Sequence, residues 1–224
     1  MKLYYHPISN TSRPILLFAA DHDLDLALQV VDLFTGEHTK DAYAAVNPSR
    51  MVPVLEDGDF RLTECSAILK YLADKIGSPA YPKDLKQRAR VNERMDWFNT
   101  QFYRDWGYGL IYPQLFPNLK RPNEEQQKGV VAWGKEKSKV WLAILDKDLI
   151  GPKNAYVCGN QITLADYLGA AYITAGEAVR CQFDAYPNVC RWLENMKRGK
   201  NWAKVNKPFY DLAASLKEMP LEAI

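Results

Sequence analysis

The chain has 224 residues, of which 47% are hydrophobic and 25% are charged, and its formal net charge is +2. This composition is typical of a soluble globular protein, and the length suffices for one or two domains. So small a net charge gives no reason to expect nucleic acid or an anionic membrane as a partner. No stretch approaches the ~18 apolar residues of a membrane span, and the sequence shows no signal peptide.

The four cysteines form no C-x-x-C pair, and the three histidines show no metal-ligand spacing with them. We therefore expect no metal site. Free thiols without an export signal favour the reducing cytoplasm as the location of the protein.

The first third of the chain alternates short strand-like runs with helical patterns. The predicted elements are a strand at 2–5, a helix at 13–22, a strand at 27–33, a further helical turn, a β-hairpin around Asp57 and Gly58, and a helix that starts near Thr63 or Glu64 and ends before Gly77. This order predicts a small α/β sandwich with a mixed sheet.

A proline-containing segment, residues 78–84, interrupts this pattern and is interpreted as an interdomain linker. Nearly every pattern after it is helical, and Thr163 with Asp166 forms a capping box at one helix start. We therefore divide the chain into an α/β domain (1–77), a linker (78–84) and an all-α domain (85–224).

Three hydroxyl residues, Ser9, Thr11 and Ser12, stand where the first strand gives way to the first helix. Backbone N–H groups at a helix start are unpaired and attract negative charge. One of these hydroxyls can therefore cap the helix while another contacts a bound anion. Ser12 is nearest the helix start and is the better candidate for the cap, although Ser9 could also fill that role.

A second group of residues suits an extended peptide. A cis bond between Val52 and Pro53 would leave the N–H and C=O groups of Val52 free to pair with a peptide backbone. Glu64 and Cys65 open the next predicted helix, which offers N–H groups to a carboxylate, while the Glu64 carboxylate suits an ammonium group. A zwitterionic peptide end would satisfy both.

The segments YYHPISNTSR, GEH, NPSRMVPVLEDGDFRLTECSAILKYLA and ITLADY together resemble the cytosolic glutathione S-transferases. The serine-type branch, with the theta and delta classes, is the most similar. The resemblance implies a thioredoxin-like N-terminal domain with a mixed four-stranded sheet and a cis proline, followed by an all-helical domain. It also implies a homodimer that uses glutathione as co-substrate.

The same resemblance assigns residues to the parts of glutathione. These are Ser9 at the thiol, His38 at the glycine carboxylate, Val52 and Pro53 at the cysteinyl part, Glu64 at the γ-glutamyl ammonium, and Cys65 at the γ-glutamyl carboxylate. Cys65 departs from the usual serine, and a thiol is a weak donor, so we expect weaker glutathione binding unless the Cys65 N–H or Ser66 compensates. A second hypothesis gives Cys65 a lowered pKa and a mixed disulfide with glutathione.

Elementary acid–base chemistry supports a thiolate site. A free thiol of pKa ~8.5 is only about 3% ionised at neutral pH, and the thiolate is the nucleophile. A hydroxyl donor and a helix N-terminus that together stabilise the thiolate by ~2.7 kcal/mol would lower that pKa by ~2 units. Ser9 is the expected donor. Tyr4 and Tyr5, on opposite faces of the first strand, remain alternatives because other classes of the family use a tyrosine there.

An aromatic band around 102–112 is expected to end in an irregular helix near Gly107, Gly109 and Pro113, overhanging the site. We expect Tyr103, Arg104 or Trp106 to line the electrophile pocket.

The predicted function is glutathione transfer to small electrophiles, as in detoxification. The alternatives are a glutathione-dependent peroxidase or dehalogenase, and a non-catalytic protein of the same fold that binds apolar ligands, which Cys65 would favour. A glutaredoxin-type role is disfavoured because the first strand-to-helix turn contains no cysteine.

Overall fold

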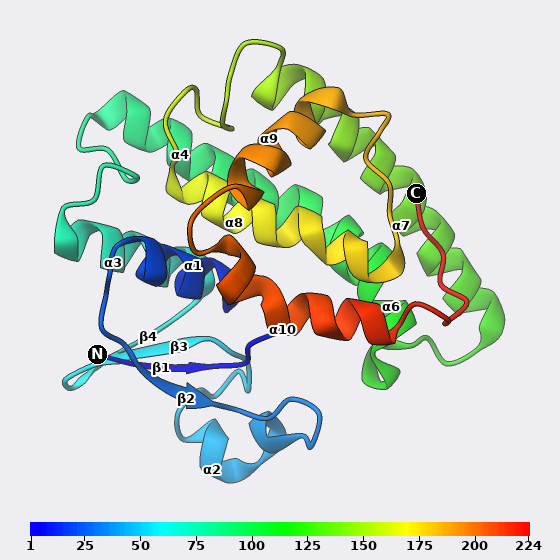
Figure 1. Ribbon diagram of the computed structural model, residues 1–224. Helices are drawn as coiled ribbons and strands as arrows, with labels where there is room; N and C mark the ends of the chain where they lie inside the picture. Colours follow the sequence, from blue (N-terminus) through cyan, green and yellow to red (C-terminus); the bar gives the residue numbers. More distant parts are fainter.

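A computed structural model describes all 224 residues of the protein. Four strands form one sheet in its N-terminal part (Figure 1). The strands are β1 (Lys2–Tyr5), β2 (Ala27–Val30), β3 (Val54–Asp57) and β4 (Phe60–Thr63). Their order is β2-β1-β3-β4, with β1 parallel to β2 and antiparallel to β3. The predicted mixed four-stranded sheet is therefore confirmed.

The central strands β1 and β3 supply buried residues to the core, whereas β2 is an exposed edge. Leu3 of β1 and Leu55 of β3 lie opposite each other and have no exposed surface. All four residues of β2 are exposed. The strand ends at Val30, earlier than the predicted strand over 27–33, because the Asp32 carboxylate accepts N–H groups two and three residues further on and starts a turn.

Short helices cover both sides of the sheet. Helices α1 (Arg13–Asp21) and α3 (Cys65–Ile76) pack together on the side that faces the helical domain, and α2 (Asp41–Ala44) lies on the other side (Figure 1). The 3-10 helix η1 (Glu37–Thr39) precedes α2. A small separate core lies on the α2 side, and its members are Val31, Tyr43, Val52 and Val54.

The turn between β3 and β4 contains Gly58. Its φ of +65° lies in the left-handed region, which glycine adopts without strain. Asp57 pairs with Phe60 directly across this turn. The hairpin predicted from Asp57-Gly58 is confirmed.

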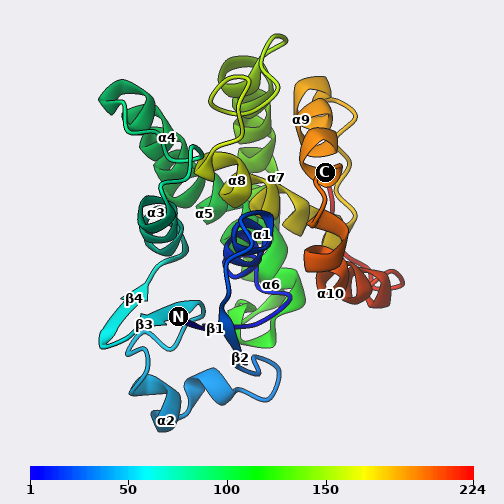
Figure 2. The ribbon, with the colours of Figure 1, turned by 60° about the vertical axis from the view of Figure 1, so that its left-hand side comes forward.

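The rest of the chain is helical, as predicted. The α-helices are α4 (Leu85–Trp97), α5 (Tyr103–Asp105), α6 (Tyr112–Leu115), α7 (Glu124–Ile144), α8 (Leu164–Thr174), α9 (Pro187–Lys197) and α10 (Trp202–Ser215). Figure 2 shows α8 between α4 and α9, and every residue of α8 is buried. The predicted capping box of Thr163 and Asp166 is present at its start. None of the helices combines the length and hydrophobicity that a membrane crossing requires.

Helix α4 continues almost without a break into α6 through two π-helical segments, η2 (Phe98–Phe102) and η3 (Trp106–Ile111). The irregular helix end expected near Gly107, Gly109 and Pro113 is present: η3, which contains both glycines, is π-helical, and α6 ends at Leu115, two residues after Pro113. Such π segments are frequent at functional sites. The remaining short helices are η4 (Pro117–Leu119), η5 (Leu145–Ile150) and η6 (Ala175–Val179).

Segment η3 contacts α7 backbone to backbone. A Cβ atom added at Gly134 of α7 would lie 2.4 Å from the carbonyl carbon of Gly109. Only glycine permits this approach, so the pair fixes how closely η3 lies against α7.

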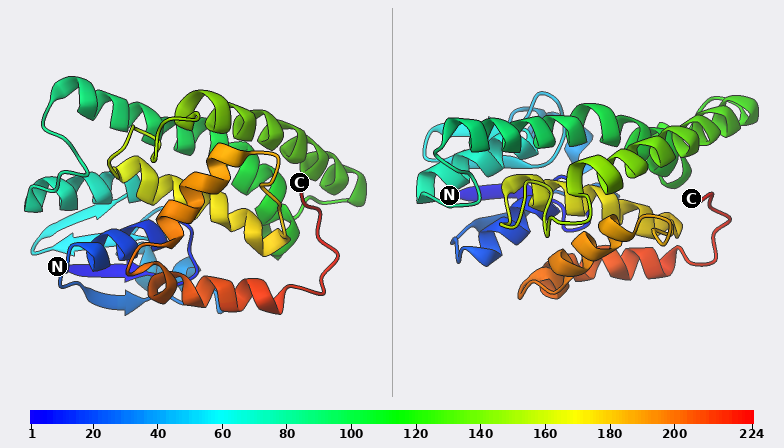
Figure 3. Two further views of the ribbon diagram at one scale, coloured as in Figure 1. Left: turned by 45° about the horizontal axis from the view of Figure 1, so that its top comes forward. Right: turned by 90° about the horizontal axis from the view of Figure 1, so that it is seen from above.

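The guanidinium group of Arg13 joins the two domains. Arg13 is 1% exposed, and it donates to Asn206 Oδ1 of α10 and to the Ala171 carbonyl of α8, each at 2.8 Å. The guanidinium also lies over the ring of Phe209 at 3.9 Å. Beyond α10, the C-terminal segment turns back along the helical domain (Figure 3), where Glu222 pairs with Lys135 of α7.

Candidate active site

Two adjoining cavities form a cleft between the loops of the sheet domain and the α4–α6 stretch. The first, of about 270 Å³, contains Glu64 and Cys65 and is called the Glu64 cavity. The second, of about 220 Å³, contains Ser9 and His38 and is called the Ser9 cavity. The residues that line both are Thr11, Met51, Val52, Tyr103 and Tyr108.

The turn after β1 brings its hydroxyl groups together. Ser9 Oγ accepts a hydrogen bond from the Ser12 N–H (3.3 Å), and its backbone carbonyl accepts from the N–H of Arg13 (2.9 Å). Ser12 Oγ instead accepts from the His6 N–H (3.4 Å) and caps no helical N–H. The expectation that Ser12 caps the helix is therefore wrong, because its hydroxyl is engaged by the chain that precedes the turn.

Thr11 connects this turn to the loop before β3. Thr11 Oγ1 donates to the Val52 carbonyl oxygen at 3.0 Å, and it lies 3.0 Å from Ser9 Oγ. Both groups of Val52 were expected to be free, but its carbonyl oxygen already accepts from Thr11. The Val52–Pro53 peptide bond is cis, and Pro53 is buried.

Glu64 stands at the start of α3 in a strained conformation. Its φ of 67° and ψ of 115° are unusual for a residue with a side chain, and such strain concentrates at functional sites. The exposed carboxylate makes no hydrogen bond or ion pair within the protein, and it borders the Glu64 cavity. A cation that entered the cavity would find this charge unpaired.

Cys65 lines the same cavity but is only 5% exposed. Burial, together with the neighbouring Glu64 carboxylate, raises the pKa of the Cys65 thiol far above its ordinary value. The lowered pKa expected for Cys65 is therefore wrong, and the mixed disulfide with glutathione stays a hypothesis that loses this support. The thiol is protonated at neutral pH and acts at most as a weak donor.

His38 borders the Ser9 cavity from the 3-10 turn η1. The side chain is half-buried, and its Nδ1 atom is buried with no hydrogen-bond partner. An unpartnered buried nitrogen is costly, so a ligand group that bonds to it would relieve the cost.

The opposite wall of the cleft is formed by three tyrosines, Tyr103, Tyr108 and Tyr112. Tyr103 stacks on Tyr172 with ring centroids 3.9 Å apart, and its hydroxyl contacts that of Tyr112. Asn10 donates to the Tyr112 hydroxyl at 3.0 Å and accepts from Arg13 at 2.7 Å. Burial raises the pKa of Tyr112 to about 12, and it raises the pKa of Tyr103 well above its ordinary value. Both phenols therefore remain protonated and can donate hydrogen bonds.

Arg104 and Trp106, predicted to line the electrophile pocket, border neither cavity. Arg104 points outward and pairs with Asp105 at 3.0 Å. Trp106 is fully buried in the core, where its indole N–H donates to the Tyr172 carbonyl at 2.8 Å. The π turns rotate these two side chains away from the cleft and present Tyr108 and Tyr112 instead.

Tyr108, Tyr112 and Thr11 were not predicted to belong to the site. Their signal in the sequence is weak: Thr11 stands among three hydroxyl residues, and the two tyrosines lie in an aromatic band from which only Tyr103 and Trp106 were expected at the pocket. Tyr4 and Tyr5, the alternatives to Ser9, line neither cavity of the cleft.

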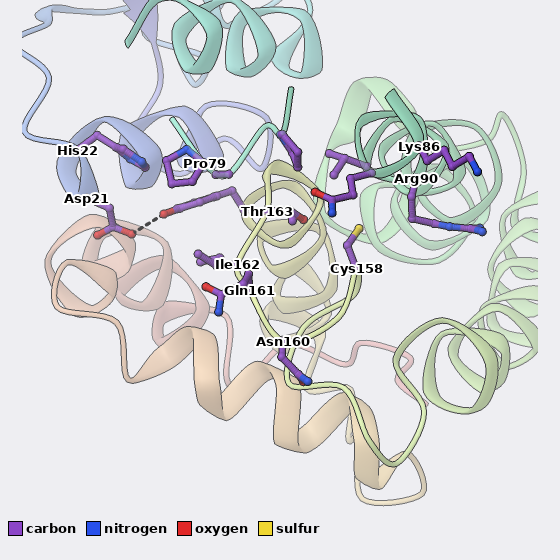
Figure 4. A pocket seen from close by; sticks show the side chains of 15 residues that line it. Asp21, His22, Pro79, Lys86, Arg90, Cys158, Asn160, Gln161, Ile162 and Thr163 are labelled. Atoms are coloured by element: carbon purple, nitrogen blue, oxygen red, sulfur yellow. Dashed lines mark hydrogen bonds between the residues drawn. The ribbon is translucent and has the colours of Figure 1, made fainter. Parts of the chain in front are cut away.

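The largest cavity of the protein, about 880 Å³, lies elsewhere (Figure 4). It is bounded by the end of α1, the linker, the start of α4 and the loop before α8, and the Tyr167 hydroxyl donates to Asp21 at its side. None of the predicted site residues lines it. Burial raises the pKa of Cys158, its one thiol, to about 11. We therefore place the candidate active site in the two adjoining cavities rather than in this larger one.

Comparisons with known proteins agree with this fold. The glutathione S-transferase N-terminal domain matches residues 8–75, and the glutathione S-transferase C-terminal domain matches residues 111–198. Glutathione S-transferase theta-1 of Homo sapiens is 35% identical over 201 residues, which cover 88% of this chain and 82% of that protein. The chain belongs to the glutathione S-transferase family.

Solved structures of this family superpose on the chain closely. The apo form of human glutathione-S-transferase T1-1 has a TM-score of 0.82 at 30% identity, covering 95% of this chain and 90% of that one. Human glutathione transferase theta-2, solved with glutathione, has a TM-score of 0.85 at 26% identity, and the match covers 100% of this chain and 93% of that one. A delta-class enzyme of Nilaparvata lugens has a TM-score of 0.80 at 33% identity and covers 96% and 99%.

Proposed function

We propose that this protein is a glutathione transferase, in which the thiolate of bound glutathione attacks a small electrophile. Residues 1–77 form the domain that binds glutathione, and residues 85–224 form the domain that binds the electrophile. Residues 78–84 link the two domains. The observation that carries the proposal is the cleft itself: a polar cavity beside an unpaired carboxylate opens into an aromatic one. The theta-2 relative solved with glutathione supports this reading.

The polar residues of the cleft match the groups of an extended tripeptide. The unpaired Glu64 carboxylate suits the γ-glutamyl ammonium, and the N–H of Val52 suits the cysteinyl backbone. His38, whose Nδ1 has no protein partner, suits the glycine carboxylate. Cys65 offers its backbone N–H at the start of α3 to the γ-glutamyl carboxylate, since its buried thiol is a weak donor.

The sulfur of a tripeptide held in this way would lie where the two cavities meet. Ser9 donates its hydroxyl proton there, and the N–H groups at the start of α1 add positive potential. A combined stabilisation of ~2.7 kcal/mol would lower the thiol pKa by ~2 units and make the thiolate the major form at neutral pH. The thiolate then attacks an alkyl or aryl halide, an epoxide or an activated alkene.

We further propose that the protein is a cytoplasmic homodimer whose ligands are glutathione and an electrophile, without a metal. Exposed apolar side chains on the sheet domain support dimerisation, among them Met51 (53% exposed) and Phe60 (46% exposed).

The direct experiment incubates the protein with glutathione and a panel of electrophiles and identifies products by mass spectrometry. We expect glutathione conjugates, and we expect Ser9→Ala to lower turnover at least tenfold. Ser215→Ala is the matched control, because its exposed hydroxyl bonds only to the Leu212 carbonyl at the end of α10.

Other outcomes would identify the alternatives. Halide release without a conjugate would indicate a dehalogenase, and peroxide consumption alone would indicate a peroxidase. Tight binding of apolar ligands in calorimetry, without any binding of glutathione, would contradict the enzyme proposal in favour of a binding protein. Normal turnover in Ser9→Ala together with an inactive Tyr5→Phe would transfer the thiolate role to Tyr5.

A further inference from the structure

Thr11 lies beside the position that the reacting sulfur of glutathione must reach. The proposed tripeptide extends from Glu64 in the Glu64 cavity to His38 in the Ser9 cavity, so its central cysteinyl sulfur lies near the junction of the two cavities. Thr11 lines both cavities, whereas Ser9 lines only one. Thr11 therefore lies at the junction of the two cavities, with its hydroxyl 3.0 Å from Ser9 Oγ and 3.0 Å from the Val52 carbonyl oxygen.

The hydroxyl protons of this turn can be assigned from the acceptors present. The Val52 carbonyl oxygen has no proton, so the Thr11 hydroxyl donates to it across 3.0 Å. A hydroxyl has one proton, so Thr11 Oγ1 can only accept from Ser9 across their 3.0 Å contact. Ser9 Oγ in turn accepts from the Ser12 N–H. The order of donation is therefore Ser12 to Ser9, Ser9 to Thr11, and Thr11 to Val52.

A bound thiolate changes which acceptor the Thr11 proton prefers. An anion accepts a hydrogen bond roughly twice as strongly as a neutral carbonyl does. The proton moves from one acceptor to another by rotation about the Cβ–Oγ1 bond, without any movement of the backbone. The Val52 carbonyl does not lose its partner, because the backbone N–H of an extended peptide at Val52 can replace the hydroxyl.

We propose that Thr11 is a second thiolate donor of this site: its hydroxyl donates directly to the sulfur of glutathione, beside the hydroxyl of Ser9. The inference rests on the glutathione transferase function proposed above. The thiol proton leaves to solvent, and both hydroxyl groups keep their own protons. When the thiolate is bound, the Ser9 proton turns from Thr11 to the sulfur, as the Thr11 proton turns from the Val52 carbonyl, so each hydroxyl donates its single proton to the anion.

The test is the pKa of the glutathione thiol on the enzyme, followed by ultraviolet difference absorbance in Thr11→Val and Thr11→Ser. We expect Thr11→Val to raise that pKa by about one unit, which corresponds to a tenfold change in ionisation. Thr11→Ser retains the hydroxyl and should stay close to wild type. At pH values below the bound-thiol pKa, kcat of Thr11→Val should fall about tenfold, and KM for glutathione should change little.

Thr100→Val is the matched control, because the Thr100 hydroxyl bonds to the Asp96 carbonyl and lines neither cavity. Thr11→Ala, which removes the hydroxyl without adding a methyl group, gives the same readout should Thr11→Val fail to fold. An unchanged bound-thiol pKa with a raised KM would show that Thr11 only holds Val52 in place, and would overturn the inference. A wild-type protein that binds no glutathione would instead overturn the proposed function first.

Discussion

The two walls of the cleft are built in different ways. The wall from the sheet domain consists of short polar groups on turns that directly follow or precede strands, such as Thr11, Val52 and Glu64. The wall from the helical domain consists of the rings of Tyr103, Tyr108 and Tyr112, which π-helical turns present to the cleft. The first wall is set by local backbone geometry, and the second by packing between distant segments.

This difference suits a transferase that keeps one substrate constant and varies the other. Backbone groups and a carboxylate match the fixed pattern of donors and acceptors in a tripeptide. Electrophiles share few polar groups. Aromatic rings suit them because an apolar surface requires no particular direction of hydrogen bonding from the ligand. The two walls meet through Asn10, which bonds to Arg13 and to the Tyr112 hydroxyl.

The change with the largest expected effect removes Arg13, which joins the two domains and bonds to Asn10, the residue through which the walls meet. Arg13→Met leaves Asn10, Asn206 and the Ala171 carbonyl without their buried donor, and each unsatisfied group costs about 1–3 kcal/mol. We expect a loss of about 3 kcal/mol or more in the free energy of unfolding, measured by urea denaturation. Arg90→Met is the control, because its exposed pair with Glu93 contributes at most about 1 kcal/mol. Equal losses in the two variants would show that Arg13 does not hold the walls together.

A smaller effect is expected from displacing only the aromatic wall. Gly134→Ala places a methyl group against the Gly109 backbone, and overpacking of this kind costs about 1–3 kcal/mol. Because η3 also carries Tyr108, we expect altered electrophile KM with glutathione affinity preserved, measured by steady-state kinetics and calorimetry. Gly129→Ala, in the same helix with no neighbour within 4 Å, should stabilise the protein by about 0.5–1 kcal/mol. A parallel loss of glutathione affinity in Gly134→Ala would indicate that the walls are not independent.

Glu64→Gln tests the polar wall alone. A hydrogen bond to a charged partner contributes about 1.5–3 kcal/mol, so KM for glutathione should rise at least about tenfold. Glu56→Gln is the control, since Glu56 pairs with Arg61 on the sheet and lines neither cavity. A fall in kcat without any change in KM would place Glu64 in the chemical step rather than in binding.

The smallest expected effect is a pH dependence of stability at His6. Burial lowers the pKa of His6 below its ordinary 6.5, and His38 lowers it further. The nearby Asp32 carboxylate raises the pKa of His6, but burial has the larger effect. The neutral ring accepts the Ile8 N–H at Nδ1, so protonation would break that bond. The native state then binds fewer protons than the unfolded state, and this stability is present above pH 6.5 and is lost as pH falls below it.

Urea denaturation at pH 7.5 and pH 5.5 measures this contribution of His6. The free energy of unfolding should fall between pH 7.5 and pH 5.5. This fall should be smaller in His6→Gln than in wild type, with a difference of less than about 1 kcal/mol. An identical fall in both proteins would assign the effect to other groups.

Much of the fold could be predicted because its signals are local. Asp57-Gly58 specifies a turn by backbone preference alone, and Thr163 with Asp166 specifies a helix start through two hydrogen bonds within four residues. The polar wall shares this property. Glu64 is positioned by the start of α3, so its presence at the site could be predicted from nearby residues.

The aromatic wall could not be predicted in the same way. Tyr103 and Trp106 are three residues apart and would share a face of a regular helix. Tyr103 nevertheless borders the cleft and Trp106 is fully buried, because π turns and the contact of η3 with α7 set their directions. Helical periodicity assumes regular turns, and it therefore misplaced Arg104 and Trp106. The hydrogen bond from Thr11 to Val52 joins residues far apart in the chain, so sequence spacing could not have revealed it.

The central claim is that this cleft holds glutathione so that its sulfur ionises more readily than in solution. Titration of the protein–glutathione complex by ultraviolet difference absorbance measures this property directly. We expect a bound-thiol pKa about two units below the ~8.5 of the free thiol. A bound thiol that titrates like free glutathione would contradict the claim.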